Sequence, residues 1–143
     1  MSSDFIPAHL SPEFEQALRP LMKQRVFAKG ATLYRHGMKA EGLYLLEGGA
    51  VRVLVPASDN QNQLLEVAGE GAILGLSEAL SGETFRATVE ADETTTASFI
   101  ARSDFVALLN GNHEFSMELV RLLSDSLHGL YHRFRSVCAH PGR

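Results

Sequence analysis

The residues best suited to chemistry in this sequence form a short cassette that could hold a phosphate group. It runs from Gly71 through Gly75 and Ser77 to Arg86. Gly75 lets the backbone approach a ligand closely, and Ser77 with the residues after it begins a helical turn whose free N–H groups favour an anion. Arg86 opens a strand a short loop later, where its guanidinium group could close over a phosphate held by that turn. The pattern indicates a phosphate site.

A purely structural interpretation of Arg86 stands beside this one. An arginine at the start of a strand is usually solvated or paired with a nearby carboxylate, and both Glu78 and Glu83 lie close in the sequence. The residues of the cassette alone leave the two interpretations open.

Short strands must position the cassette. Between Val26 and Ile100, apolar or alternating runs are separated by Gly, Asn, Asp and Ser, which is typical of a chain with many short strands. In one run Val51 and Val53 take one face and Arg52 the other, as a half-buried strand requires. We expect eight strands in a sandwich or barrel, at Arg25–Ala28, Thr32–Tyr34, Leu43–Leu46, Ala50–Val55, Leu64–Ala68, Ile73–Leu74, Phe85–Glu90 and Thr95–Ile100.

Helices are expected on both sides of this strand region, which covers residues 25–101. A capped helix over residues 11–19 should end at Pro20. Ser103 is placed to cap a second helix that stops at Gly111. Asn112 can then cap a last, long helix, so that the C-terminal helices span residues 103–138.

The last helix carries a sustained apolar stripe. A helix of about 25 residues extends about 38 Å at 1.5 Å per residue, more than a compact body of this size covers. We therefore expect part of the stripe to meet a second copy, which makes the chain a homodimer. The alternative, that the whole stripe packs on its own barrel, stays open. The stripe consists of Phe115, Leu119, Leu122, Leu123, Leu127, Leu130, Phe134 and Val137.

The composition limits the classes of function. The 143 residues, 45% of them hydrophobic, are enough for a single domain over residues 1–143 that needs no disulfide or metal. The net charge of −4 disfavours DNA binding by this chain alone. The single cysteine, Cys138, has no partner for an intramolecular disulfide. With no leader pattern, and no apolar stretch near the roughly 20 residues that a bilayer requires, we expect a cytoplasmic protein without membrane contact.

No catalytic centre or metal site is predicted. No serine or cysteine has the surroundings of an activated nucleophile. Asp125, His128 and His132 lie at helical steps of three and four, but no fourth ligand is identifiable and exposed histidines on helices are common. We therefore expect a protein that is not an enzyme and holds no metal.

Four features occur together in a fixed order: the segments Lys29–Gly37, Gly42–Val53 and Gly71–Gly75, followed by Arg86. Together they resemble the cyclic-nucleotide-binding domain of the bacterial catabolite activator and oxygen-sensing regulator family, over roughly residues 27–137. The resemblance implies a mainly β fold with flanking helices, an eight-stranded jelly-roll β-barrel. It also implies that the long C-terminal helix forms the dimer interface and that the nucleotide lies between barrel and helix.

The resemblance assigns roles to individual residues. The phosphate and ribose side comprises Gly75, Leu76, Ser77, Arg86, Ala87 and Thr88, with Arg86 paired to the cyclic phosphate. The base side comprises Val53, Leu65, Leu130 and Tyr131. The dimer helix contributes Leu119, Leu123, Leu127, Leu130 and Phe134.

Two departures from the family pattern bear on ligand binding. Cyclic-AMP binders of this family carry a glutamate on the ribose hydroxyl where this chain has Leu76, and a phosphate-binding Ser or Thr where it has Ala87. Hydrogen bonds to charged groups contribute about 1.5–3 kcal/mol each, so losing both would weaken binding by roughly two to four powers of ten. Ser77 or Thr88 is a candidate for a replacement hydroxyl. Cyclic AMP and cyclic GMP are therefore candidate ligands only.

The expected function is that of a sensory or regulatory module. Regulators of the family continue past the long helix into a helix-turn-helix DNA-binding domain, whereas this sequence stops at Arg143 without a recognition helix. We expect either the effector module of a transcription regulator or a stand-alone signalling protein. The alternative is a ligand-free dimerisation or protein-interaction module with a degenerate pocket, in which Arg86 pairs with Glu78.

Overall fold

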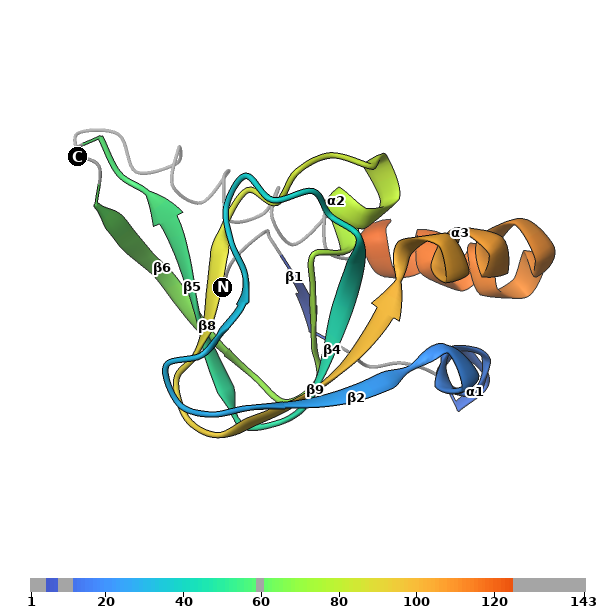
Figure 1. Cartoon of the computed structure of the whole chain (residues 1–143). Coiled ribbons are helices and arrows are strands. Elements are labelled where there is room, and N and C mark those ends of the chain that lie inside the picture. Colours follow the sequence, from blue (N-terminus) through green and yellow to red (C-terminus); the bar gives the residue numbers. More distant parts are fainter. Residues whose placement is uncertain (1–4, 8–11, 59–60, 125–143) are drawn as a thin grey trace, which may run out of the picture.

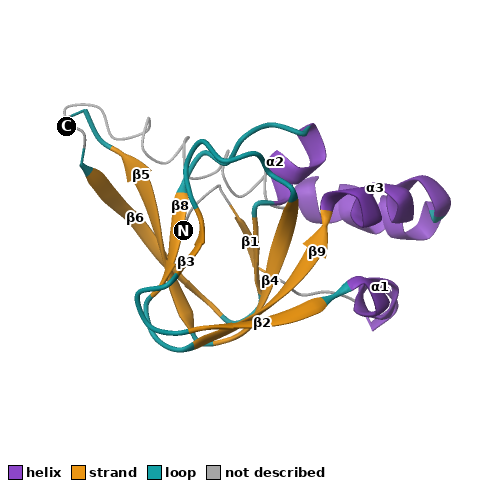
Figure 2. Ribbon diagram, viewed as in Figure 1, coloured by secondary structure: helices purple, strands orange, loops and turns teal. Residues whose placement is uncertain are grey.

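Two antiparallel sheets, with short helices gathered at one side, make up the part of the chain that the computed structural model describes, residues 5–7, 12–58 and 61–124 (Figure 1, Figure 2). The first sheet has the strand order β1-β7-β4-β9-β2. Its strands are β1 (Phe5–Pro7), β7 (Ala72–Leu74), β4 (Gly42–Gly48), β9 (Thr95–Ala101) and β2 (Lys23–Phe27). The second has the order β3-β8-β5-β6, with β3 (Thr32–Tyr34), β8 (Thr88–Ala91), β5 (Ala50–Pro56) and β6 (Asn62–Gly69).

The alternation of side chains along β5 explains how the second sheet covers the core. Val51 and Val53 are almost fully buried, while Arg52 between them is exposed. Across the sheet Val51 lies opposite Ala91 and Val53 opposite Val89, two further buried residues. One face of the sheet is therefore apolar and packs against the first sheet.

The prediction of a mainly β fold is confirmed, and each of the eight predicted strands overlaps an observed one. The prediction of a closed eight-stranded barrel is wrong, because nine described strands form two separate sheets with their own edges. The additional strand, β1, pairs with β7 through Phe5 opposite Leu74. The strand β1 has only three residues and ends in a proline, so its sequence shows no alternation that would predict a strand. It forms because it pairs with β7, which is distant in the sequence.

Two hydrophobic cores lie on the two faces of the first sheet. The inner core, between the sheets, contains Tyr34, Tyr44 and Phe85 together with the three buried valines of the described residues. The outer core lies between the first sheet and the helices, and includes Leu43 of β4 and Ile100 of β9. Successive side chains of β4 therefore pack alternately in the outer and the inner core, as expected of a strand that is buried on both faces.

The helices are α1 (Pro12–Leu18), a 3₁₀ turn η1 (Arg19–Leu21), α2 (Leu76–Ser81) and α3 (Arg102–Gly111), followed by a helical segment over residues 113–124. The predicted end of α3 at Gly111 is confirmed. The prediction that Ser103 caps α3 is wrong, because β9 runs to Ala101 and the helix begins directly at the next residue without a side-chain cap.

The helical segment over residues 113–124 begins as the sequence predicts. The side chain of Asn112 accepts a hydrogen bond from the Phe115 N–H at 3.0 Å, which confirms the predicted cap. Phe115 stacks on Phe14 of α1, with ring centres 4.2 Å apart, and Leu119 is buried in the outer core. The described part of the stripe therefore packs on its own domain; the predicted remainder, to residue 138, lies outside the described residues.

Candidate phosphate-binding site

Gly75 is the N-cap of α2, and its backbone has a left-handed conformation with φ of 80°. The group that approaches its backbone closely is the ring of Phe85: a Cβ atom added at Gly75 would lie 2.8 Å from Phe85 Cε1. Gly75 is thus required both by its positive φ and by the aromatic ring beside it. The sequence pattern predicts a close approach by a ligand and contains no signal for the contact with Phe85.

Arg86 lies on a bend two residues before β8, rather than in the strand that was predicted to begin at Phe85. The strand starts later because this segment pairs with a neighbouring loop instead of with β5. The Phe85 N–H donates to the Met38 carbonyl at 2.8 Å, and the Gly37 N–H donates to the Phe85 carbonyl at 2.9 Å. The Arg86 side chain projects from this bend and is 61% exposed.

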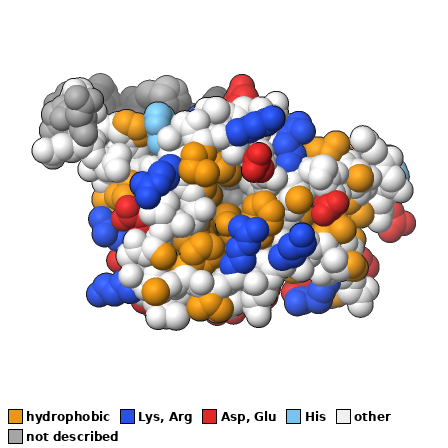
Figure 3. All heavy atoms as spheres, viewed as in Figure 1, with side chains coloured by type: hydrophobic (Ala, Val, Ile, Leu, Met, Phe, Trp, Pro, Cys, Tyr) orange, Lys and Arg blue, Asp and Glu red, His pale blue; other side chains and the backbone are white. Residues whose placement is uncertain are grey.

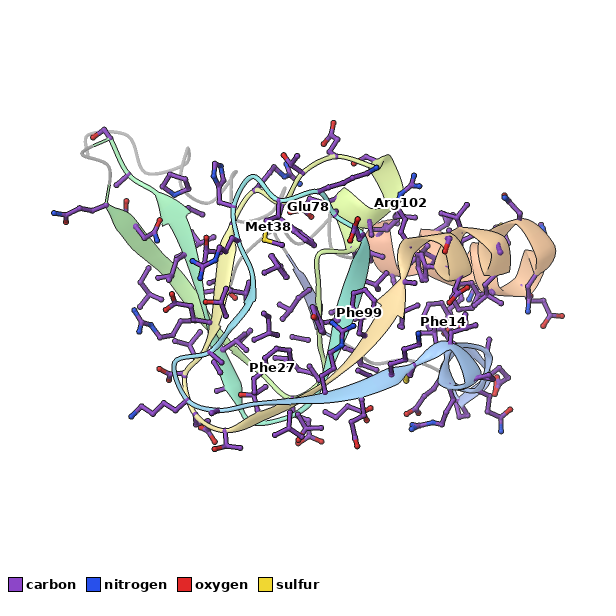
Figure 4. All side chains as sticks on the ribbon, viewed as in Figure 1. Phe14, Phe27, Met38, Glu78, Phe99 and Arg102 are labelled. Atoms are coloured by element: carbon purple, nitrogen blue, oxygen red, sulfur yellow. The ribbon has the colours of Figure 1, made fainter. Side chains whose placement is uncertain are left out.

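Glu78 is the buried carboxylate of the site, with a side chain 3% exposed. Its Oε2 accepts a hydrogen bond from the Arg86 backbone N–H at 3.2 Å and lies 3.9 Å from Arg86 Nε. Its Oε1 is buried and has no hydrogen-bond partner among the residues that the structure describes. Figure 4 shows Glu78 between α2 and the loop that carries Met38. A backbone N–H and a guanidinium group thus both face one carboxylate oxygen.

Arg102, at the start of α3, fixes the other end of α2. Its Nε donates to the Ala79 carbonyl at 2.6 Å, and its guanidinium group lies beside Gly82, the C-cap of α2 (Figure 4). A cation at a helix C-terminus satisfies free carbonyl groups and suits the helix dipole. The position of the cassette therefore depends on α3 through this contact.

The two residues that depart from the family pattern are both buried. Leu76 packs in the outer core, against the helices, and Ala87 packs in the inner core between the sheets. Thr88 is also buried, and its Oγ1 accepts the His36 N–H at 3.0 Å. Ser77 is exposed at the start of α2. Of the two candidate hydroxyl groups, that of Thr88 already has a backbone partner.

The two described residues of the expected base side lie on neighbouring strands and differ in burial. Val53 is 1% exposed and lies in the inner core, whereas Leu65 is 46% exposed on β6. The register between β5 and β6 shifts at this point, since Val53 pairs with Glu66 and Leu54 with Leu64, leaving Leu65 without a partner across the sheet. Leu130 and Tyr131, with Leu127 and Phe134 of the predicted dimer helix, lie outside the described residues.

Aromatic rings fill the space next to the cassette. The rings of Tyr34 and Phe85 stack with centres 3.8 Å apart, and Tyr44 packs against Phe99 at 5.2 Å. Arg25 of β2 lies over Phe99, 4.2 Å from the ring centre, and donates to the Tyr44 hydroxyl at 2.9 Å. The interior beside Gly75 is therefore occupied by side chains of the protein itself.

Charged groups on this side of the molecule are mixed. In Figure 3 basic side chains gather near α2 and have an acidic one among them.

Within the described ranges, no cluster of His, Cys, Asp and Glu has the composition of a metal site, and no helix is long and apolar enough to cross a membrane.

Comparison with known proteins adds a family match and a set of similar folds. Residues 24–112 match the family model described as the cyclic nucleotide-binding domain. Sodium/hydrogen exchanger 7 of Arabidopsis thaliana is 29% identical over an alignment of 137 positions that covers 87% of this chain and 12% of the exchanger.

Among solved structures, the N-terminal domain of a transcriptional regulator from Streptomyces coelicolor A3(2) superposes with a TM-score of 0.75 at 24% identity, covering 87% of this chain and 89% of that one. The catabolite activator protein of Thermus thermophilus superposes with a TM-score of 0.77 at 23% identity, covering 91% of this chain and 61% of that one. At these identities the two structures establish the shared fold.

Proposed function

Because the chain belongs to the cyclic nucleotide-binding domain family, we propose that it is a sensory or regulatory domain that binds a small phosphate-bearing ligand at the α2 cassette. The observation that carries the proposal is the position of Arg86. Its side chain is 61% exposed at the end of the cassette, while the residues on both sides of it, Phe85 and Ala87, are buried. An exposed guanidinium group between two buried residues is well suited to bind a phosphate.

In this proposal the cyclic phosphate pairs with Arg86, and the ligand contacts a set of residues assigned by family resemblance. The phosphate and ribose side is Gly75, Leu76, Ser77, Ala87 and Thr88, and the base side is Val53, Leu65, Leu130 and Tyr131. Cyclic AMP and cyclic GMP are the candidate ligands. The side chains of Leu76 and Ala87 offer no hydrogen bond, so we expect affinity below that of family members with both polar groups.

The proposed output is a change in how the C-terminal helices of a homodimer pack. A ligand shifts such an equilibrium only if it binds one arrangement more tightly than the other. Support comes from two apolar residues of the helical segment that are exposed to solvent: Met117 is 42% exposed and Val120 is 55% exposed. The proposed interface comprises Leu119, Leu123, Leu127, Leu130 and Phe134. Of these, Leu119 is buried in the outer core of its own domain and Leu123 packs in part against that core, so most contacts to a second copy would come from the other three.

The proposal includes the setting of the domain. Residues 1–143 act as one cyclic-nucleotide-binding-like unit in the cytoplasm, either as the effector module of a transcription regulator or as a stand-alone signalling protein. The unit has no catalytic activity and does not bind DNA by itself.

A second candidate function is a ligand-free dimerisation or protein-interaction module. Two observations favour it: the Phe85 ring lies against Gly75, and Glu78 faces Arg86. In such a module the fold is retained while the cassette serves only to pack the domain.

The test is isothermal titration of the protein with cyclic AMP and cyclic GMP. The matched variants are Arg86→Ala and Arg52→Ala, which each remove one exposed arginine, the second from the outer face of β5. Binding that is lost in Arg86→Ala and kept in Arg52→Ala supports the sensory function. Absence of heat with both nucleotides rejects it in favour of the interaction module.

A further inference from the structure

The anion nearest to Arg86 belongs to the protein itself. Glu78 Oε2 accepts the Arg86 N–H and lies 3.9 Å from its guanidinium nitrogen. A bound phosphate would use the same kinds of donor, a backbone N–H and a guanidinium group. The carboxylate therefore occupies the position of an internal counter-ion at the proposed phosphate site.

The burial of Glu78 is costly and calls for a physical explanation. A buried carboxylate is stable only when hydrogen-bond donors satisfy it, yet Oε1 has none among the described residues. The described donors that face the carboxylate both come from Arg86, one from its backbone and one from its side chain. The position of Glu78 thus depends on Arg86, and Glu78 is a negative charge placed beside the Arg86 guanidinium group.

We propose that Glu78 is an internal competitor for the ligand phosphate and keeps the Arg86 site latent. A phosphate that approaches Arg86 meets a carboxylate on the same guanidinium group, and the like charges repel. Binding then requires the carboxylate to turn away or to share its donors. The inference rests on the proposed function, because it concerns the affinity of that same site for a phosphate-bearing ligand.

The test compares two glutamine variants. Glu78→Gln removes the charge and keeps a carbonyl oxygen that can accept the Arg86 N–H. Glu83→Gln removes an equal charge from an exposed residue of the following loop and serves as the control. We expect Glu78→Gln to bind cyclic AMP at least about tenfold more tightly than the unmodified chain, a difference of about 1.4 kcal/mol. Glu83→Gln should stay within about twofold.

The outcomes separate this inference from the function on which it rests. Equal affinity of the unmodified chain and Glu78→Gln overturns the inference and leaves the sensory function standing. Weaker binding by Glu78→Gln also overturns it, since Glu78 would then orient Arg86 for the ligand. Absence of binding in all three proteins rejects the sensory function and the inference together.

A measurement on the unmodified chain keeps the test valid if Glu78→Gln does not fold. The side-chain NMR signals of Arg86 Nε and of the Glu78 carboxyl carbon are followed as cyclic AMP is added. Competition predicts that both signals shift together with the same midpoint. A shift of the Arg86 signal while the Glu78 signal stays in place overturns the inference.

Discussion

The Phe85 ring lies directly against the backbone of Gly75, so close that a Cβ atom at Gly75 would be 2.8 Å from Phe85 Cε1. Contacts of this length are not tolerated between carbon atoms, and the ring is held by stacking on Tyr34. The glycine that opens α2 and the residue before Arg86 therefore form one packed unit. We expect a side chain added at Gly75 to displace the Phe85 ring.

Gly75→Ala should destabilise the protein through this contact. The variant places a side chain in a left-handed backbone, which costs roughly 1–2 kcal/mol, and adds overpacking against Phe85 of about 1–3 kcal/mol. The control is Gly30→Ala, where φ is 89° and a Cβ atom would meet nothing within 4 Å. Urea denaturation should show the larger loss for Gly75→Ala. Equal losses would mean that the Phe85 ring moves aside freely.

Local pattern was sufficient to predict most of the strands and failed where distant residues decide the structure. The alternation around Val51 and Val53 is a property of neighbouring residues, and these two are buried as predicted. Glu78 is buried beside Arg86, and Phe85 lies against Gly75. Both contacts connect residues that are separated along the cassette. Periodicity carries no information on such contacts, so the sequence indicates the residues of the site but not how their side chains pack against one another.

Asn112→Ala should lower the free energy of unfolding by about 1 kcal/mol. The side-chain oxygen of Asn112 accepts the Phe115 N–H, and alanine leaves that donor without a partner at the start of the helix. Asn110→Ala is the matched control, since Asn110 is exposed within α3 and alanine is the better helix former there. Thermal melts followed by circular dichroism compare the two. A loss in both variants would argue against a role specific to the cap.

Arg102→Ala should loosen α2 in particular. The Arg102 guanidinium group donates to the Ala79 carbonyl, and a hydrogen bond from a charged group contributes about 1.5–3 kcal/mol. Amide hydrogen exchange should show faster exchange within Leu76–Ser81 than in the unmodified chain, with the strands of the inner core little changed. Arg35→Ala, which removes an exposed arginine from a loop, is the control. Uniform acceleration across the domain would instead indicate a general loss of stability.

Arg25 and Tyr44 should be energetically coupled. Arg25 donates to the Tyr44 hydroxyl and lies over the Phe99 ring, so Arg25→Ala loses a hydrogen bond and a cation–π contact. Tyr44→Phe loses the hydrogen bond alone, at about 0.5–1.5 kcal/mol. In a double-mutant cycle, Tyr44→Phe should cost little once Arg25 is already alanine. Additive losses would show that the hydrogen bond contributes nothing to stability.

Leu76→Glu tests whether the glutamate of family members can be restored at this position. The Leu76 side chain is 2% exposed in the outer core, so a glutamate there would bury a charge that has no described partner. We expect a loss of at least about 3 kcal/mol in urea denaturation and no gain in cyclic AMP affinity. Leu76→Met keeps volume and polarity and should lose less than about 1.5 kcal/mol. If Leu76→Glu is as stable as Leu76→Met and binds cyclic AMP more tightly, then burial at residue 76 does not keep a glutamate there from reaching the ligand.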